Sequence, residues 1–442
     1  MLSYRSLGQP RHPLRVALAE DTELVFSDDY RYGWRQGFSG IGCDVQSFDV
    51  GVLRRCTTVI GSPYRSIGPR ATVKGLAKQI AEWRPDLVWC HQGRWTALSG
   101  FAEMLRNAGV RTATYLCDEP YECGETVHYA RHFDHVFTMD PCTIAAHQAA
   151  RGGGNVWYLP PGVDTDRFVP LPYAQRSVPA LFLGNADLVP RKEWFAPIEQ
   201  HVPGARVMYH SQVRHGKHVS IGKGSPDWIP TEKHPELYGS CVVGLNVHRS
   251  PWITEECLTK RVRGPQRKVL PGGLRLCEDA TEFGTGFWND LNLPAAHVNP
   301  RFFEMAACGT LVVSDDHRFE LARMFPFAPR ASTPEHFLEL VQHYIKHRDE
   351  AEAIGRACSF LISGRHSYRH RAAEVLVRAG LRDASEVARL SSLGPPEEWL
   401  TTQDFGWLRD ASPSDLTGRS GFWSPALGMS LMERSGLLSA AI

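Results

Sequence analysis

The stretch from Asn299 to Asp316 constrains the fold of this chain more than any other part of its sequence. Its first half begins after Pro300, places apolar residues at helical spacing and ends at Gly309. Glycine enters the left-handed conformation without a Cβ clash, so it suits the end of a helix. The residues that follow, 310–314, form an apolar run typical of a central strand in a parallel sheet. The stretch therefore predicts a helix that leads directly into a buried parallel strand.

Glu304 places a charge among the apolar residues of this predicted helix. An unpaired buried carboxylate costs several kcal/mol, so this side chain needs a partner. Two interpretations are open at this point. The carboxylate binds a ligand, or it forms a local cap or salt bridge. Only the first interpretation gives the stretch a function beyond folding.

The size and charge of the chain limit the classes of protein to consider. At 442 residues it is too long for one ordinary hydrophobic core, which favours two domains plus an extension. Its 49 Lys and Arg residues nearly balance its 48 Asp and Glu residues, and the net charge of +1 argues against a globally basic nucleic-acid-binding protein. A local basic patch is still compatible with this balance.

The cysteines and the apolar runs predict a cytoplasmic protein. The eleven cysteines include no Cys-x-x-Cys pair and no zinc-like spacing, which is typical of reduced thiols in a cytosolic protein. The N-terminus has no apolar core that could serve as a signal peptide, and no run approaches the ~18 apolar residues of a membrane span. We therefore expect a cytoplasmic location and no membrane span.

Two successive α/β units are predicted along the chain. The first opens with an apolar strand at 14–19, a helix and a second strand at 44–48, and this β-α-β pattern implies a doubly wound parallel sheet. The second begins with a strand at 180–185, after a loose, proline-bearing stretch. The predicted organisation is an N-terminal domain at 1–165, a linker at 166–179, a C-terminal domain at 180–382 with an insertion around 250–298, and an extension at 383–442 that packs back on the body.

The 299–316 stretch resembles a known family. Phe303-Glu-Met-Ala-Ala-Cys-Gly309, followed by an apolar strand and Ser314-Asp-Asp316, is similar to the C-terminal domain of GT-B glycosyltransferases, in particular the CgeB-like (spore-maturation) branch of the group-1 enzymes. Arg84-Pro-Asp, Asp118-Glu-Pro and the phrase at 133–140 occur in the same order as similar phrases in CgeB-like proteins. The resemblance therefore reaches into the N-terminal half of the chain.

This resemblance implies both a fold and an activity. The fold is GT-B, an α/β architecture in which two Rossmann-like, doubly wound domains face a central cleft. The activity is that of a hexosyltransferase-type glycosyltransferase, which moves a sugar from a nucleotide-sugar donor, most commonly UDP-linked, to an acceptor hydroxyl. Retention of the anomeric configuration is expected from the group-1 branch.

The resemblance also assigns donor-binding residues. In this family the motif glutamate accepts hydrogen bonds from the donor's ribose hydroxyls, and the matching residue is Glu304. A diphosphate needs backbone N–H groups at a helix start and one or two cations, which the turn at 184–185 and the Arg191-Lys192 pair offer. Related enzymes often carry a second glutamate eight positions earlier, where this chain has Ala296, so that contact is missing or supplied from elsewhere. The predicted donor-binding residues are Glu304, Gly184, Asn185, Arg191, Lys192, Asn246, Asn299 and Arg301.

Polar residues at the ends of N-terminal strands are the candidates for catalysis. His91, Asp118 and Glu119 follow neighbouring strands, and open α/β sheets bind ligands beyond the carboxyl ends of their strands. Asp118 lies where related enzymes often place a catalytic histidine or aspartate. There it could orient the acceptor or balance the charge that develops on the sugar carbon. The alternative is that Asp118 only caps a turn. Glu20 and Asp21, after the first strand, are weaker candidates for a general base.

No metal or other cofactor is expected. Asp164-Thr-Asp166 matches the Asp-x-Asp pattern that binds a divalent metal in the other major glycosyltransferase fold, but here it sits in a Pro-Gly-Val-Asp turn that Asx-turn chemistry explains. The nineteen histidines form no His-Glu-x-x-His set, and the chain has no phosphate-binding Gly-x-x-x-x-Gly-Lys-Ser/Thr loop.

The acceptor and the class of activity are left open by the sequence. A basic run at 260–268 keeps DNA with a hydroxylated base among the candidate acceptors, because clustered Lys and Arg bind a phosphate backbone. A solvated surface loop would explain this basic run equally well. A nucleotide-sugar epimerase and a non-catalytic nucleotide-sugar-binding protein share the same fold. The candidate contacts to an acceptor or to nucleic acid are Arg261, Arg263, Arg267 and Lys268.

Overall fold

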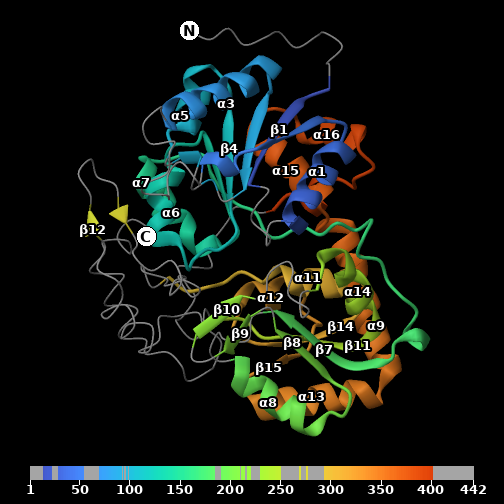
Figure 1. The fold of residues 1–442 in the computed structure, drawn as a ribbon. Helices are drawn as coiled ribbons and strands as arrows, with labels where there is room; N and C mark the ends of the chain where they lie inside the picture. Colours follow the sequence, from blue (N-terminus) through green and yellow to red (C-terminus); the bar gives the residue numbers. More distant parts are fainter. Residues whose placement is uncertain are drawn as a thin grey trace.

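The chain folds into two α/β domains, one above the other (Figure 1). The computed structural model describes residues 13–21, 28–53, 69–91, 93, 96–97, 99–184, 191–209, 211–214, 217–220, 229–249, 268–269, 275–276 and 293–401. Each domain is built on one parallel sheet with helices on its faces, which confirms the predicted architecture of two Rossmann-like domains.

The N-terminal domain contains a six-stranded parallel sheet in the order β2-β1-β3-β4-β5-β6. Its central strands are almost fully buried, as expected for parallel strands with helices on both faces. The strands are β1 (Arg15–Glu20), β2 (Asp44–Asp49), β3 (Leu87–His91), β4 (Thr112–Leu116), β5 (His135–Thr138) and β6 (Val156–Tyr158). The carboxyl ends of β1, β3 and β4 therefore lie side by side, as the sequence predicted.

Along each strand, alternate side chains pack into two different hydrophobic cores. Ala17 and Val88 face one core, which α3 and α5 cover, whereas Val16 and Trp89 face the other, which α1 covers. This alternation follows from the two-residue repeat of a strand. The helices of the domain are α1 (Asp28–Gly40), α3 (Pro69–Trp83), α5 (Phe101–Asn107), α6 (Cys123–Ala130) and α7 (Ile144–Arg151).

The C-terminal domain contains a five-stranded parallel sheet in the order β15-β14-β11-β7-β8. Its strands are β7 (Val178–Gly184), β8 (Arg206–Tyr209), β11 (Cys241–Asn246), β14 (Leu311–Asp315) and β15 (Arg330–Ala331). Its helices are α8 (Arg191–His201), α9 (His234–Ser240), α11 (Pro300–Ala307), α12 (Phe319–Met324), α13 (Pro334–Lys346) and α14 (Arg348–Arg365). Two short antiparallel pairs, β9 (Ser211–Arg214) with β10 (Lys217–Ser220) and β12 (Lys268–Val269) with β13 (Arg275–Leu276), lie outside this sheet.

The predicted helix-to-strand motif is present as α11 and β14. Gly309 lies between them with a φ of 67°. This is the left-handed conformation that was predicted for a glycine at the end of the helix. β14 pairs with β11 on one side and β15 on the other, so it is an interior strand. Figure 1 shows α11 and α12 on the side of the C-terminal domain that faces the N-terminal domain.

The end of the described chain returns to the N-terminal domain. α15 (Tyr368–Arg378) lies within the range predicted for the second domain, yet it packs against α1 of the first (Figure 1). α16 (Ala384–Leu390) and α17 (Pro396–Trp399) continue on this side, and Trp399 is 2% exposed in the same core. Residues 383–401 of the predicted extension are thus part of this core.

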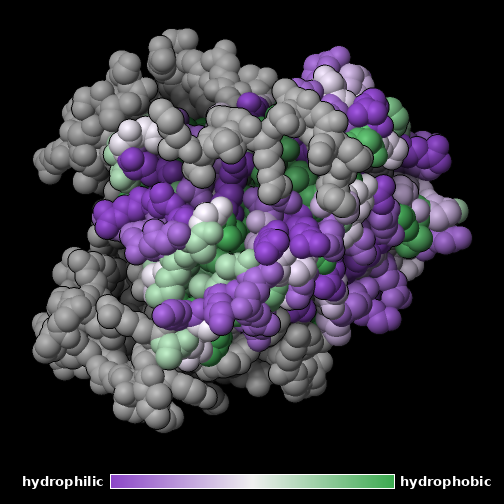
Figure 2. Space-filling model, turned by 90° about the horizontal axis from the view of Figure 1, so that it is seen from above, coloured by the Kyte–Doolittle hydropathy of each residue, from purple (hydrophilic) through white to green (hydrophobic). Residues whose placement is uncertain are grey.

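Three further observations concern the surface and the thiols. Seen from above, the described surface is mostly hydrophilic, with hydrophobic residues in smaller patches (Figure 2). Within the described ranges, no helix combines the length and the apolar character that crossing a membrane demands. The eight cysteines that the structure describes form no disulfide.

Gly37→Ala is expected to lower the free energy of unfolding by about 1–3 kcal/mol, because overpacking a tight contact forces backbone shifts of that cost. The new Cβ would lie 2.5 Å from the carbonyl oxygen of Tyr368, a backbone atom that cannot swing aside. Gly75→Ala in α3 is the matched control. No described atom lies within 4 Å of its Cβ, so this variant should gain about 0.5–1 kcal/mol. Denaturant unfolding measures both, and equal effects would contradict the close approach of α1 and α15.

Candidate active site

A hydrogen-bond network fixes the start of α11. Asn299 caps the helix, because its side-chain oxygen accepts from the Phe302 N–H at 3.2 Å, and Pro300 occupies the first helical position. The Asn299 side-chain amide donates to Asn246 Oδ1 at 2.8 Å, and the Asn246 amide donates to Ser314 Oγ at 2.9 Å. These bonds tie both predicted donor-binding asparagines to the position of the helix.

A buried histidine–aspartate pair supports the same network. His248 Nδ1 donates to Asp315 Oδ1 at 2.8 Å, and the His248 backbone N–H donates to the same carboxylate. His248 Nε2 accepts from the Asn299 N–H at 3.4 Å. Burial lowers the pKa of His248 to about 3, so the ring is neutral at physiological pH and can accept at Nε2 while donating at Nδ1.

Three arginines, Arg191, Arg249 and Arg301, gather next to this helix start, and we call them the arginine cluster. Arg191 begins α8, is 4% exposed, and donates from Nε to the Val247 carbonyl at 2.7 Å. Burial lowers the pKa of Arg191 well below its usual value, and the charges of Arg301 and Arg249 lower it further. The pKa of Arg301 is lowered by burial too, and Arg249 adds to that effect. The cluster is therefore a site of concentrated positive charge.

Gly184, at the end of β7, makes room for Arg301. A Cβ at this position would overlap the Arg301 guanidinium, so any larger residue would displace it. The guanidinium carbon lies 4.7 Å from the centre of the Phe182 ring, a cation–π distance. Arg301 Nη1 is shielded from solvent and has no hydrogen-bond partner among the described residues. One helical turn further on, the half-buried Glu304 attracts the Arg301 charge and raises the Arg301 pKa.

Side chains of the N-terminal domain meet this region directly. Tyr121, in the loop after β4, accepts from Arg318 Nη2 at 2.6 Å, and Arg318 also donates to the Arg249 carbonyl at 2.8 Å. The Arg249 guanidinium carbon lies 5.2 Å from the centre of the Tyr121 ring. Asp140, just after β5, accepts three N–H groups from Ala296 and His297. The structure thus joins the two domains beside the arginine cluster.

Among the predicted catalytic residues, Asp118 is the one that lies near the arginine cluster. Burial raises the pKa of Asp118, while the nearby charges of Arg249 and His297 oppose that rise. His91, on the next strand, contacts Cys117 Sγ through Nε2 at 3.4 Å and stacks on Tyr30 with ring centres 4.4 Å apart. Burial lowers the pKa of His91 to about 4, so its ring is neutral near pH 7.

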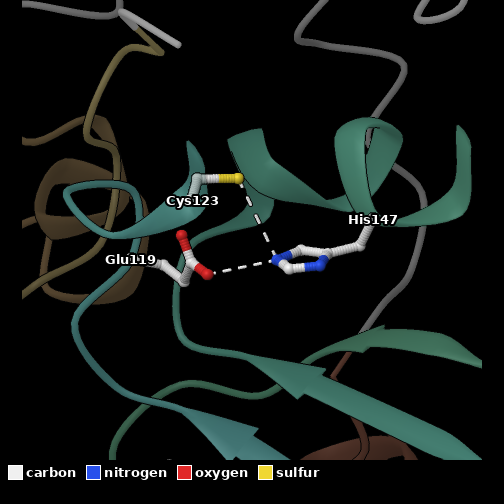
Figure 3. Close-up of side chains that lie close together, drawn as sticks. All are labelled: Glu119, Cys123 and His147. Atoms are coloured by element: carbon white, nitrogen blue, oxygen red, sulfur yellow. Dashed lines mark hydrogen bonds and ion pairs between the residues drawn. The ribbon is translucent and has the colours of Figure 1, made fainter. Parts of the chain in front are cut away.

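The other acidic candidates have different surroundings. Glu119 is fully buried, accepts from the Thr126 hydroxyl, and contacts His147 Nε2 at 3.1 Å, in a separate cluster (Figure 3). Glu20, at the end of β1, has its pKa raised to about 7, chiefly by burial, which suits a proton acceptor near neutral pH.

The Asp-x-Asp sequence forms a turn, as predicted. Asp164 Oδ1 accepts from the Asp166 N–H at 3.2 Å, which is the Asx-turn arrangement. Asp166 pairs with Arg369 at 2.6 Å. Both carboxylates therefore have structural partners at the domain junction.

Several predicted contacts cannot be located. Asn185 and the basic residues Arg261, Arg263 and Arg267 lie outside the described residues. Lys192 and Lys268 lie on α8 and β12, but their side chains are not among those described. The predicted nucleic-acid contact therefore stays a prediction.

Sequence analysis missed several residues at this boundary, namely Tyr121, Asp140, Arg249, His297 and Arg318. Two of them carried a usable signal. Asp140 ends the family-like phrase at 133–140, just after a strand. Arg249 follows Asn246, the last residue of another strand, by three positions. His297 had no such signal, because it follows the insertion, where no motif was recognised, and directly succeeds the alanine at the expected glutamate position.

Comparisons with known proteins agree with the sequence motif. Residues 283–377 match a protein-family model described as "Glycosyl transferase-like", and this segment contains α11 and β14. None of the curated proteins is similar enough to count as a match. Sucrose-phosphate synthase from Thermosynechococcus elongatus is similar in structure, at 11% sequence identity and a TM-score of 0.48, over 82% of this chain and 97% of that one.

Two further solved structures show a similar degree of likeness. Anabaena HepE, in complex with UDP-glucose, has 12% identity and a TM-score of 0.49, over 82% of this chain and 99% of that one. The catalytic domain of starch synthase IV from Arabidopsis thaliana has 10% identity and a TM-score of 0.49, over 86% of this chain and 100% of that one.

The matched segment carries the motif helix, which lies at the boundary of two parallel-sheet α/β domains. Residues 283–377 of this two-domain chain are therefore glycosyltransferase-like. Its placement in the CgeB-like branch stays a prediction.

His91 should stay neutral across the physiological pH range. An NMR titration of its ring is expected to give a pKa of about 4, with His91→Asn used to assign the signal. Because the folded-state pKa lies below the value of 6.5 for the free side chain, the unfolded chain takes up a proton first as the pH falls. The wild type should therefore lose more stability than His91→Asn between pH 6.5 and pH 4. Titration of His91 near its free value would contradict its burial.

Proposed function

We propose that this chain is a glycosyltransferase of the GT-B type, which binds the diphosphate of a nucleotide-sugar at the arginine cluster and transfers the sugar to an acceptor hydroxyl with retention of configuration. The observation that carries the proposal is the gathering of Arg191, Arg249 and Arg301 beside the start of α11. Such a cluster is expensive in the free protein, because like charges close together disfavour one another and Arg191 is buried. A ligand with two negative phosphates offsets that cost.

The chemistry of the cluster favours a diphosphate over a single carboxylate. Guanidinium groups present planar pairs of N–H donors that match phosphate oxygens, and three of them can reach two adjacent phosphates. Arg301 brings an Nη1 group that lacks a hydrogen-bond partner in the described structure. The same charges would stabilise the nucleoside diphosphate as it leaves, so we expect the donor site to work without a divalent metal.

Glu304 is the proposed partner of the ribose. It lies one helical turn after Arg301, close enough to raise the Arg301 pKa, so a ribose bound at Glu304 would place its phosphates at the cluster. A carboxylate is acceptor-only when ionised and can take hydrogen bonds from two neighbouring hydroxyls. UDP-linked hexoses are the first donors to test.

Asp118 is the proposed residue on the acceptor side. It follows β4 of the N-terminal domain and experiences the charges of Arg249 and His297 from the C-terminal domain. This position supports two roles in the transfer step: orienting the acceptor hydroxyl, and balancing the positive charge that develops on the sugar carbon. His91 is proposed to support the same loop through Cys117 rather than to carry a proton, because its ring stays neutral.

The correct donor should raise the melting temperature of the full chain, because a ligand that binds only the folded state stabilises it by about 2.7 kcal/mol at 100 times its Kd. Glu304→Ala should lose most of that rise. Glu339→Ala, on the exposed face of α13, is the matched control and should keep it. The measurement is a thermal-shift series over nucleotide-sugars. If Glu304→Ala keeps the full shift, the ribose does not bind at this carboxylate.

Gly184→Ala should weaken donor binding and leave stability nearly unchanged. The new methyl displaces the flexible end of Arg301, so a charge-assisted hydrogen bond worth about 1.5–3 kcal/mol is lost, equivalent to a tenfold or greater rise in donor KM. Gly364→Ala, in α14, is the control, because no described atom lies within 4 Å of its Cβ. Steady-state kinetics at varied donor concentration measure both variants. An unchanged donor KM in Gly184→Ala would show that Arg301 does not contribute to donor binding.

A further inference from the structure

Three different metal-ligand side chains meet in the core of the N-terminal domain. Glu119 lies in the loop after β4, Cys123 begins α6, and His147 lies in α7 (Figure 3). All three are buried, each with 0% exposure. Glu119 Oε1 and Cys123 Sγ lie 3.1 Å and 4.0 Å from His147 Nε2. No sequence pattern signals this group, because its members are separated by four and twenty-four positions with no metal-binding spacing.

The carboxylate in this group lacks adequate compensation. Among the described residues, Glu119 forms an ion pair with His147 alone, and its Oε2 is buried without a hydrogen-bond partner. A buried carboxylate is costly unless it is paired or coordinates a metal. The surroundings are partly apolar, since Cys123 packs in one cluster with Ala146 and Leu293.

We propose that Glu119, Cys123 and His147 bind one divalent transition-metal ion of the zinc type. Carboxylate oxygen, thiolate sulfur and imidazole nitrogen are the three donor types that zinc prefers. The donor atoms lie within 4.8 Å of one another, so one ion between them comes within a few tenths of an ångström of bond lengths of about 2.0–2.3 Å.

Charge balance supports a divalent ion. On binding, the Cys123 S–H bond breaks, the proton leaves to solvent, and sulfur forms the metal bond as a thiolate. His147 binds through Nε2 as the neutral tautomer with its proton on Nδ1. One carboxylate, one thiolate and a divalent cation give a neutral centre, which lowers the cost of burial.

Thr126 completes the arrangement around the ligands. Its hydroxyl donates to Glu119 Oε1 and lies 3.5 Å from His147 Nε2. Such a hydrogen bond holds a ligating carboxylate in one orientation. The ion would tie α6 and α7 to the loop that carries Asp118 and Tyr121. Its role is structural, and it is independent of the donor site, where the arginine cluster supplies the positive charge.

The test is the metal content of the full chain. After growth with added zinc and exhaustive dialysis, elemental analysis should find roughly one zinc ion per chain, as a single site with three protein ligands requires. Cys123→Ala should reduce this to background. Cys358→Ala is the matched control, because Cys358 is also buried in a helix, at 1% exposure, and should leave the zinc content unchanged. With Co²⁺ in place of zinc, the wild type should show a thiolate-to-cobalt charge-transfer band that Cys123→Ala lacks.

A second variant covers the case in which Cys123→Ala fails to fold. Thr126→Val keeps all three ligands and removes the supporting hydroxyl, so it should weaken zinc affinity by about 10-fold or more while circular dichroism stays native. A natively folded chain that holds neither zinc nor cobalt overturns the proposal. So does equal zinc in the wild type and Cys123→Ala, which would place the ion elsewhere, for example at the exposed His343–His347 pair.

Discussion

The carboxylate of Asp140 is the contact on which the geometry between the domains depends. It projects from the end of β5 and accepts from the Ala296 N–H at 2.8 Å, the His297 N–H at 3.1 Å and His297 Nδ1 at 2.8 Å. A second oxygen accepts from the Cys142 N–H, so the charge is fully satisfied although it is buried. These bonds fix the segment that enters α11. Because α11 carries Arg301 and Glu304, this side chain of the N-terminal domain helps to position the proposed donor-binding residues.

The arginine cluster gathers three cations beside the start of α11, where we propose that the diphosphate binds. Arg191 donates to the Val247 carbonyl, the Arg301 guanidinium lies over the face of Phe182, and the Arg249 guanidinium lies over the ring of Tyr121. Carbonyl and aromatic partners orient a cation without cancelling its charge. In the proposed function, the repulsion among these charges favours an anionic ligand, and their fixed positions would reduce the rearrangement that binding needs.

The sequence predicted what is encoded locally and missed what is encoded at long range. The helix ending at Gly309 and the apolar strand after it follow from periodicity and from one residue that tolerates a positive φ, so α11 and β14 were predictable. The contact of Tyr121 with Arg318 joins residues 197 positions apart, and no local pattern signals it. The packing of α15 on α1 is equally non-local. Glu119 illustrates the same limit, since its strand-end position predicted a catalytic role but the fold turns its side chain into the core.

The alanine at position 296, which departs from the pattern of related enzymes, has a physical explanation in this structure. Its side chain is fully buried, and its N–H donates to the same Asp140 oxygen that His297 contacts. A glutamate here would bury a second carboxylate next to Asp140, and two like charges in a low-dielectric site cannot both stay ionised without a large cost. The buried Asp140 carboxylate therefore disfavours a glutamate at position 296. The next residue, His297, lies near Asp118 together with Arg249.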